Sequence, residues 1–367
     1  MEQPFTFADD LGPEKIVYIC EPRVGLNAIV VIDNTAAGPA IGGTRMAKDV
    51  SAEECFRLAR AMTFKNSAAA LPHGGAKSVI FGDPSMPAAN KEQLVRAFAA
   101  AIRHLTQYIP GPDMGTNETA MAWIRDEIGR AVGLPRELGG IPLDEIGATG
   151  YGLVIAAEAA EDYSDVRLKG AKVAVQGFGA VGRHAARFLA DKGAYLVAAS
   201  DSKGAIADPN GLDIEKLDAL KAEGKSVVDL HRSKKSDDIV AVECDIWIPA
   251  ARPDVLREDN VDRLKARLVL QGANIPATLG AEQRMHERGI LSIPDFIANA
   301  GGVISAAVEY RGGTETAAFD AIAEKIAANT RAMLDLGKAQ RMRPREAAIK
   351  LARARIERAM SVRRWQA

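Results

Sequence analysis

Residues 172–189 constrain the fold of this chain most strongly, because they read as a buried strand, a glycine turn and the opening of a helix. Gly177, Gly179 and Gly182 stand at GxGxxG spacing, with an apolar run before them and a helical pattern after them. A lone GxGxxG is a weak signal, but this order of strand, glycines and helix is the dinucleotide fingerprint. The alternative is a helix start that packs tightly on a strand for structural reasons alone.

A second predicted strand, residues 194–199, leads to Asp201, which lies 19 residues beyond Gly182. A carboxylate at this place commonly holds the adenosine ribose of NAD. Lys203 lies close enough in sequence to pair with a 2′-phosphate, so NADP stays open beside NAD. The next strand candidates alternate with helical patterns, which favours a doubly wound parallel sheet covered on both faces. They are residues 244–248, 267–271 and 291–293.

The length, composition and net charge of the chain limit the class of protein. A chain of 367 residues with 47% hydrophobic and 26% charged residues predicts a soluble α/β protein of two domains. We expect residues 1–145 and about 335–367 to form one domain, with C-terminal helices packing back on it, and residues 146–334 to form a Rossmann-type dinucleotide-binding domain. A net charge of -1 gives no electrostatic reason to bind nucleic acid or an anionic membrane.

Targeting and cysteine signals indicate a cytoplasmic protein without a metal. The three cysteines lie far apart and form no CxxC pair, which argues against a metal site and a disulfide framework. The acidic N-terminus lacks the pattern of a signal peptide, and no apolar run is long enough to span a bilayer.

The stretch of residues 62–77 holds the candidate chemistry of the first domain. Ser51 and Glu54 form a capping-box pattern that opens a helix, which we expect to reach Ala69 and to place Lys65 near its end. Taken alone, Lys65 is a solvated lysine at a helix C-terminus. After Pro72, the pair Gly74 and Gly75 would let a small ligand approach the backbone, and Lys77 would act as a base if burial lowered its pKa.

Several other segments remain open on the residues alone. Residues 16–20 and 26–32 read as strands, and the glycine-rich residues 38–46 read either as a loop between strands or as a ligand-facing segment. Asp113 stands in an irregular segment, where it either caps a turn or does chemistry. At the predicted carboxyl ends of the sheet, Asn274 is either a turn residue or a ligand contact, and Asn299 either a helix start or a ligand contact.

Together these segments resemble the Glu/Leu/Phe/Val dehydrogenase family, whose members are amino-acid dehydrogenases that use a nicotinamide cofactor. The resemblance covers most of the chain, and its motifs occur in the family's order and at similar spacing. They are residues 38–45, 62–66, 74–77, 112–115, 148–152, 177–182, 272–274 and 299–302.

The resemblance implies roles for residues of the first domain. It makes Lys65 the residue that binds the α-carboxylate of the substrate, Lys77 the general base, and Asp113 the group that exchanges protons with the substrate amine. Gly42 and Gly43 match the loop that lines the substrate site. The remaining residues that the resemblance assigns to the substrate are Ile41, Met62, Asn274 and Ala306.

The resemblance also implies the cofactor site and the assembly. Thr149 and Asn274 match positions near the nicotinamide and the reacting carbon. The family generally forms homo-oligomers through its first domain, so a homo-oligomer is expected. The further residues assigned to the cofactor are Gly177, Phe178, Gly179, Ala180, Val181, Gly182, Asp201, Ala250 and Asn299.

Two positions bear on the substrate. Glutamate enzymes of the family carry a lysine where this chain has Ile41, and a serine where it has Ala306. Both changes remove partners for a side-chain carboxylate, which favours an apolar amino acid of the leucine, valine or phenylalanine type. A glutamate dehydrogenase and a catalytically silent nucleotide-binding protein are the alternatives.

Two further positions depart from the family pattern. His73 replaces an apolar residue before the Gly-Gly pair, and Ala76 replaces a glycine that many members carry. His73 is either a titrating group or a packed ring, and the methyl group of Ala76 restricts the backbone beside Lys77.

Overall fold

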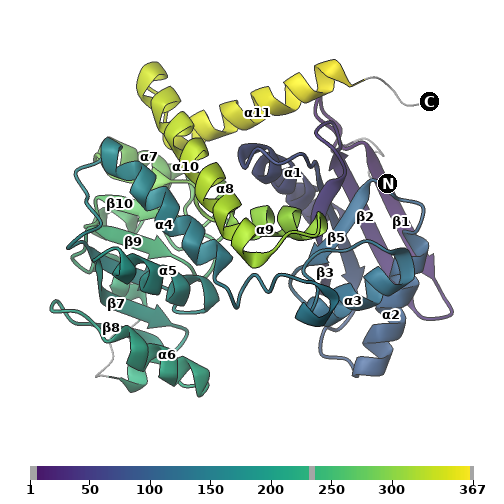
Figure 1. Ribbon diagram of the computed structural model, residues 1–367, viewed down its shortest axis with the longest axis horizontal. Coiled ribbons are helices and arrows are strands. Elements are labelled where there is room, and N and C mark those ends of the chain that lie inside the picture. Colours follow the sequence, from purple (N-terminus) through teal and green to yellow (C-terminus); the bar gives the residue numbers. More distant parts are fainter. Residues whose placement is uncertain (1–5, 231–235, 364–367) are drawn as a thin grey trace. The chain divides into compact units, whose positions relative to one another are not determined.

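The computed structural model describes residues 6–230 and 236–363, which form two compact units (Figure 1). Unit 1 comprises residues 6–142, 303–318 and 349–363, and unit 2 the described residues from 143 to 302 and from 319 to 348. No described helix is both long enough and apolar enough to cross a membrane.

Unit 1 contains a mixed sheet of five strands in the order β1-β2-β4-β3-β5. β1 and β4 run antiparallel to β2 between them, whereas β3 runs parallel to β4 and β5. The strands are β1 (Lys15–Glu21), β2 (Leu26–Asn34), β3 (Ala40–Ala47), β4 (Gly75–Phe81) and β5 (Tyr108–Pro112). The first two expected strands are thus present.

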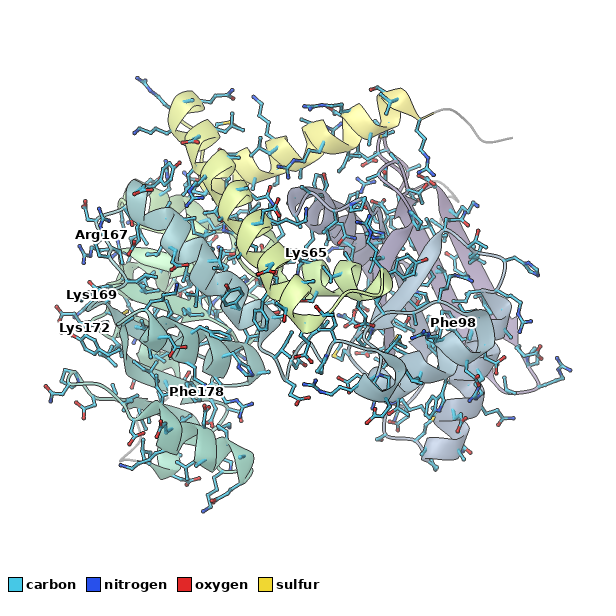
Figure 2. The ribbon with its side chains drawn as sticks, viewed as in Figure 1. Lys65, Phe98, Arg167, Lys169, Lys172 and Phe178 are labelled. Atoms are coloured by element: carbon cyan, nitrogen blue, oxygen red, sulfur yellow. The ribbon has the colours of Figure 1, made fainter. Side chains whose placement is uncertain are left out.

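Helices cover both faces of this sheet. α1 (Ala52–Ala68) begins at the cap in which Ser51 accepts from the amide of Glu54, as the sequence predicts, and buries Cys55 and Ala59 against one face. α2 (Ala88–Ala101) and α3 (Glu118–Ile128) cover the other face, where Phe98 and Ile124 are fully buried (Figure 2 labels Phe98). Because side chains alternate along a strand, Lys77 shares the α1 face of β4 with Val79.

Unit 2 contains a sheet of six strands in the order β11-β10-β9-β6-β7-β8. All neighbours are parallel except β8, an edge strand antiparallel to β7 that the sequence pattern did not predict. The chain leaves β6 for β7 on one side and later adds β9 on the other, so the order reverses between β6 and β9. The strands are β6 (Lys172–Gln176), β7 (Tyr195–Asp201), β8 (Gly204–Ala207), β9 (Ile246–Pro249), β10 (Leu268–Leu270) and β11 (Leu291–Ile293).

The first helices of unit 2 are α4 (Ala148–Ala160), α5 (Ala180–Asp191), α6 (Ile214–Ala222), α7 (Leu279–Glu287) and α8 (Asp295–Ala298). Helices α5, α6 and α7 connect successive strands, as a Rossmann-type fold requires, whereas α4 precedes β6 and α8 follows β11. Three later helices close the chain, namely α9 (Gly301–Tyr310), α10 (Glu315–Gln340) and α11 (Pro344–Val362). The predicted α/β fold class is therefore confirmed.

The boundaries of the units differ from the expected domains at residues 143–145, which belong to unit 2, and over two longer segments. Residues 303–318, expected in the nucleotide domain, belong to unit 1, where the buried Glu309 carboxylate accepts from the amides of Leu134 at 3.1 Å and Ile141 at 2.9 Å. Residues 335–348, expected in the first domain, belong to unit 2, where Arg345 pairs with two acidic side chains. Both longer segments contact residues far away in the sequence, and a local sequence pattern does not contain such contacts.

Candidate active site

A lysine and an aspartate meet at the parallel strands of unit 1. Lys77 lies within β4 and is only 5% exposed, and Asp113 follows the last residue of β5. The Lys77 ammonium donates to Oδ2 of Asp113. The strand order makes this contact possible, because β3 lies between β4 and β5 and a glycine there leaves room for both side chains.

Gly43 is that glycine. A Cβ atom at position 43 would lie 2.9 Å from Cβ and Oδ2 of Asp113 and 3.0 Å from Nζ of Lys77. Those separations are too short for any side chain without displacing one of the two groups. Its neighbour Gly42 has a different reason to be glycine, since a Cβ there would lie 1.6 Å from the carbonyl oxygen of Ala76 on β4.

The electrostatic environment of Lys77 disfavours its charged form. Burial lowers the pKa of Lys77 to about 7, and the cation of Arg45 acts in the same direction. The contact with Asp113 opposes this effect, but loss of hydration dominates for an amine buried so deeply. Lys77 is therefore able to change protonation state near neutral pH.

Asp113 is held from several sides. Oδ1 accepts from the amide of Met114 at 2.6 Å and lies 3.4 Å from Nη2 of Arg45. The amide of Asp113 donates to Oγ1 of Thr116 at 3.0 Å, and that hydroxyl donates to the carbonyl of Thr44 at 2.7 Å. The carboxylate is thus fixed by the turn that follows β5.

The other expected residues of the first domain lie on three elements. Lys65 occupies the last turn of α1 in unit 1 (Figure 2), and its charge also lowers the pKa of Lys77. Met62 lies one turn earlier on α1 and is half-buried. Ile41 in β3 is 4% exposed, and Ala306 in α9 is 6% exposed.

Two interpretations of glycine-rich segments are wrong. Residues 38–46 are largely strand β3 and not a loop, because Gly42 permits the close approach of β3 to β4. Gly74 and Gly75 do not open the backbone to a ligand: a Cβ on Gly74 would lie 1.7 Å from the carbonyl oxygen of Asn34, and one on Gly75 would lie 2.0 Å from the amide of Thr63. Both glycines serve packing inside unit 1.

His73 is a packed ring. It is 3% exposed, its Nδ1 lies 2.9 Å from the carbonyl oxygen of Pro39, and its ring meets the ring edge of Tyr310 at a centroid distance of 5.9 Å. Burial lowers the pKa of His73, so the ring stays neutral at physiological pH.

The three glycines of the turn between β6 and α5 in unit 2 have different structural roles. Gly177 has a φ of 96°, which only glycine adopts readily, and Gly182 approaches the carbonyl oxygen of Gly177 so closely that a Cβ would lie 2.2 Å from it. Gly179 caps α5, is exposed, and would carry a Cβ into open space. This pattern gives a tight turn, close helix packing and an approachable backbone at the helix N-terminus, as a bound pyrophosphate requires.

A cavity of about 820 Å³ lies elsewhere in unit 2, but one of about 550 Å³ lies beside this turn. Ala250, at the end of β9, lines it where the strand order reverses, and its amide donates to the carbonyl of Gln176. Phe178 is another lining residue of this cavity (Figure 2 labels it), and it is fully buried. Ala180 and Val181 form the half-buried first turn of α5.

Asp201 lines the same cavity, and other parts of unit 2 already hold its carboxylate. It accepts from the amides of Lys203 and Val227, the hydroxyl of Ser226 and the ammonium of Lys221, at 2.8 to 3.0 Å. These donors lower the pKa of Asp201 to about 2 despite its partial burial. The carboxylate is ionised and firmly placed, and its contact with a ribose stays a prediction.

Two asparagines meet at the carboxyl edge of the same sheet, and Thr149 lies beside the helix start that follows one of them. Nδ2 of Asn299 donates to Oδ1 of Asn274 at 3.1 Å and to the carbonyl of Gly272 at 3.2 Å. Thr149, in the first turn of α4, has its hydroxyl 3.5 Å from the place that a Cβ on Gly302 would occupy. The structure thus brings together residues that are far apart in the sequence.

The residues of this edge fit a dinucleotide. Oδ1 of Asn299 and Oε1 of Gln176 are buried acceptors without partners among the described residues. Buried polar atoms without partners are costly, and the amide and hydroxyl donors of a nicotinamide dinucleotide would satisfy them. No group of three or more potential metal-ligating side chains occurs within residues 6–230 and 236–363.

Sequence reasoning missed the residues that surround the expected ones. Arg45 and Glu54 flank the lysine–aspartate pair, and Lys221 and Ser226 bind Asp201. Arg45 stands inside the glycine-rich motif of residues 38–45, which was a usable signal. Glu54 was recognised only as part of the capping-box pattern, and Lys221 and Ser226 stand in no motif, so only the folded chain brings these three to the site.

Two family models match this chain. The model described as "Glu/Leu/Phe/Val dehydrogenase, dimerisation domain" matches residues 16–130, and the model described as "Glutamate/Leucine/Phenylalanine/Valine dehydrogenase" matches residues 139–364. The chain belongs to the Glu/Leu/Phe/Val dehydrogenase family.

Relatives of both cofactor types are similar to it. The NADP(+)-dependent glutamate dehydrogenase of Pyrobaculum calidifontis is 37% identical over 361 residues, which cover 90% of this chain and 85% of the relative. The NAD-specific glutamate dehydrogenase of Staphylococcus aureus is 39% identical over 291 residues, which cover 76% of this chain and 70% of the relative. The chain is thus an oxidoreductase that acts on CH–NH2 groups with a nicotinamide cofactor.

Solved structures agree with the fold. Hetero-hexameric glutamate dehydrogenase from Thermus thermophilus, in its leucine-bound form, matches with a TM-score of 0.86 at 28% identity, covering 97% of this chain and 91% of the other. L-tryptophan dehydrogenase from Nostoc punctiforme matches with a TM-score of 0.76 at 27% identity, covering 96% and 98%. Enzymes named for chemically different substrates therefore share this fold.

Proposed function

We propose that this enzyme oxidatively deaminates an L-amino acid with an apolar side chain to the 2-oxo acid and ammonia, reversibly. The observation that carries the proposal is the buried contact of Lys77 with Asp113 beside Gly43, which sets a proton acceptor with a pKa of about 7 next to a carboxylate. Such a group suits general-base catalysis near neutral pH.

The residues of unit 1 have separate tasks in this proposal. Lys65 holds the α-carboxylate of the substrate as a point charge. Asp113 exchanges protons with the substrate amine. Lys77 takes a proton from the water that attacks the iminium carbon, so that the tetrahedral adduct can expel ammonia. Its low pKa supports this role, because a permanently charged lysine could not accept that proton.

Unit 2 would hold the nicotinamide dinucleotide, whose nicotinamide ring would accept the hydride that leaves the α-carbon. The turn at Gly177 and Gly179 would place backbone amides and the N-terminus of α5 at the pyrophosphate. Asn299 would offer its partnerless Oδ1 to the carboxamide, and Asn274 is held beside it. Lys221 and Asp201 line the cavity beside this turn, where the adenosine ribose of NAD or NADP would bind.

Two side chains support an apolar substrate. Ile41 and Ala306 are buried and carry no charge, so neither offers a partner for a side-chain carboxylate. Burying an ionised carboxylate without a partner is unfavourable by several kcal/mol or more. The second candidate is glutamate, which is favoured by several relatives named as glutamate dehydrogenases.

Initial rates with a full panel of L-amino acids, each with NAD and with NADP, test the proposal. We expect reduction of the cofactor with leucine, valine or phenylalanine, at a kcat/KM at least tenfold above that for glutamate. A higher kcat/KM for glutamate would replace the apolar substrate by the second candidate. No reduction with any amino acid, in protein that still binds NADH, would reject the deaminase altogether.

We also propose that the chain forms a homo-oligomer through unit 1. The match of residues 16–130 to a dimerisation domain supports this, as does the similarity to the hetero-hexameric glutamate dehydrogenase of Thermus thermophilus. Light scattering coupled to size-exclusion chromatography should give a mass that is a multiple of 39.1 kDa. A monomeric mass for active enzyme would refute this proposal.

A further inference from the structure

Arg45 connects the lysine–aspartate pair to the first turn of α1. It lies in β3, two residues after Gly43 and therefore on the same face, and its side chain is 18% exposed. Nη1 contacts a carboxylate oxygen of Glu54, and Nη2 lies 3.4 Å from Oδ1 of Asp113. One planar guanidinium thus joins two carboxylates that come from different elements.

The carboxylate of Asp113 is consequently divided between two cations. Oδ1 faces Arg45, whereas Oδ2 accepts from the ammonium of Lys77. A guanidinium suits this arrangement, because its donors lie in a rigid plane and can hold two acceptors at fixed directions. A lysine at position 45 would supply the charge but not the fixed geometry.

We propose that Arg45 is a positioning residue for the acid–base pair, holding Oδ1 of Asp113 so that Oδ2 stays directed at Lys77. Glu54 anchors Arg45 from the other side. The inference rests on the proposed function and adds to it a residue that touches neither substrate nor cofactor in that mechanism.

The charges around Lys77 predict the direction in which its pKa changes when Arg45 is replaced. Removing the cation at position 45 removes a repulsion that lowers the pKa of Lys77. It also leaves Oδ1 of Asp113 without its cation, so the negative charge beside the ammonium of Lys77 is less compensated. Both effects favour protonated Lys77. The groups that act on Lys77 from the packed elements are Arg45 on β3, Glu54, Cys55 and Lys65 on α1, and Asp113 after β5.

The test is the pH dependence of kcat/KM for two substitutions at this position. In Arg45→Met we expect the acid limb of the kcat/KM profile to move to higher pH by about one unit, which is the usual scale for the loss of one neighbouring charge. Its kcat/KM at pH 7 should fall about fivefold, because the deprotonated fraction of Lys77 falls from about one half to about one tenth, and it should largely recover at alkaline pH. Arg45→Lys keeps the charge, so its limb should stay in place while kcat falls. Lys48→Met, which removes an exposed cation just after β3, is the control and should leave the profile unchanged.

A second variant, with the opposite expected effect on the pKa of Lys77, keeps the inference testable if Arg45→Met does not fold. The charge of Glu54 raises the pKa of Lys77, so Glu54→Gln should leave the acid limb in place or move it to lower pH. An unchanged limb in folded Arg45→Met, wild-type kcat in Arg45→Lys, or an alkaline shift in Glu54→Gln would overturn the inference. If the wild-type enzyme reduces no cofactor with any amino acid, the proposed function itself has failed, which is a separate outcome.

Discussion

Replacing Gly43 by alanine should damage catalysis much more than stability. The new methyl group would lie 2.9 Å from Oδ2 of Asp113 and 3.0 Å from Nζ of Lys77, and contacts of that length are roughly half an ångström too short. Either Lys77 or Asp113 must therefore move by several tenths of an ångström. Because a misplacement of about 1 Å costs about 100-fold in rate, we expect kcat to fall about 10- to 100-fold.

The stability cost of this substitution should be modest. One added methyl group in a packed region typically costs about 1–3 kcal/mol, and here the neighbours are side-chain ends on one face of the sheet. The free energy of unfolding is measured by urea titration, and kcat by NADH formation at saturating substrate.

Gly82→Ala is the matched control in the same unit. Its nearest neighbours are the movable ends of Met86 and Leu94, at 3.3 and 3.4 Å, so it should keep wild-type kcat. A Gly43→Ala enzyme with kcat within twofold of wild type would refute the claim that Gly43 makes room for a working Lys77–Asp113 pair.

Three further substitutions test stability. Asp201→Asn should lower the free energy of unfolding at pH 7 by about 1–2 kcal/mol, measured by urea titration. A pKa lowered from 3.8 to about 2 corresponds to at most about 2.4 kcal/mol, and the partial exposure of the carboxylate to water reduces this contribution. Wild type should lose this term as the pH falls from about 4 to 2, and an equal loss in the variant would contradict us. Arg345→Met leaves the buried carboxylates of Glu282 and Asp295 without their cation, so unfolding should become about 3–5 kcal/mol easier by the same measurement; a change below about 1 kcal/mol would show that the network is dispensable. As the pH falls from about 6.5 to 5, His73→Phe should lose less stability than wild type. Burial lowers the pKa of His73 in the folded chain, so the unfolded chain binds a proton there first and is favoured at low pH. Parallel plots of melting temperature against pH for the two proteins would disprove this.

Local patterns predicted the parts of the fold that depend on local physics. The strand, turn and helix around Gly177 were predictable because each glycine has a conformational or packing reason that is tied to its neighbours. The capped start of α1 at Ser51 was predictable because its capping hydrogen bond joins residues only three positions apart. Strand β3 was not, because Gly42 and Gly43 look like loop residues until β4 lies against them.

The site was predictable as a set of residues but not as an arrangement. Motifs pointed to Lys77 and Asp113, yet nothing local shows that they touch or that Arg45 divides the carboxylate, since Arg45 and Asp113 lie 68 positions apart. Asp201 illustrates the same limit. Its place at the end of β7 suggested a ribose acceptor, whereas residues 20 to 26 positions later already bind its oxygens.

The role of Lys77 as general base is tested most directly by kcat/KM of Lys77→Gln beside the affinity of the same protein for NADH. General-base catalysis typically contributes about 10²- to 10⁴-fold, so we expect at least a 100-fold loss of kcat/KM with the best amino acid. The dissociation constant for NADH should stay within twofold, because Lys77 belongs to unit 1 and the dinucleotide turn to unit 2. Wild-type kcat/KM should itself fall below about pH 7, where Lys77 takes up its proton. A Lys77→Gln enzyme that keeps more than a tenth of wild-type kcat/KM would contradict the account.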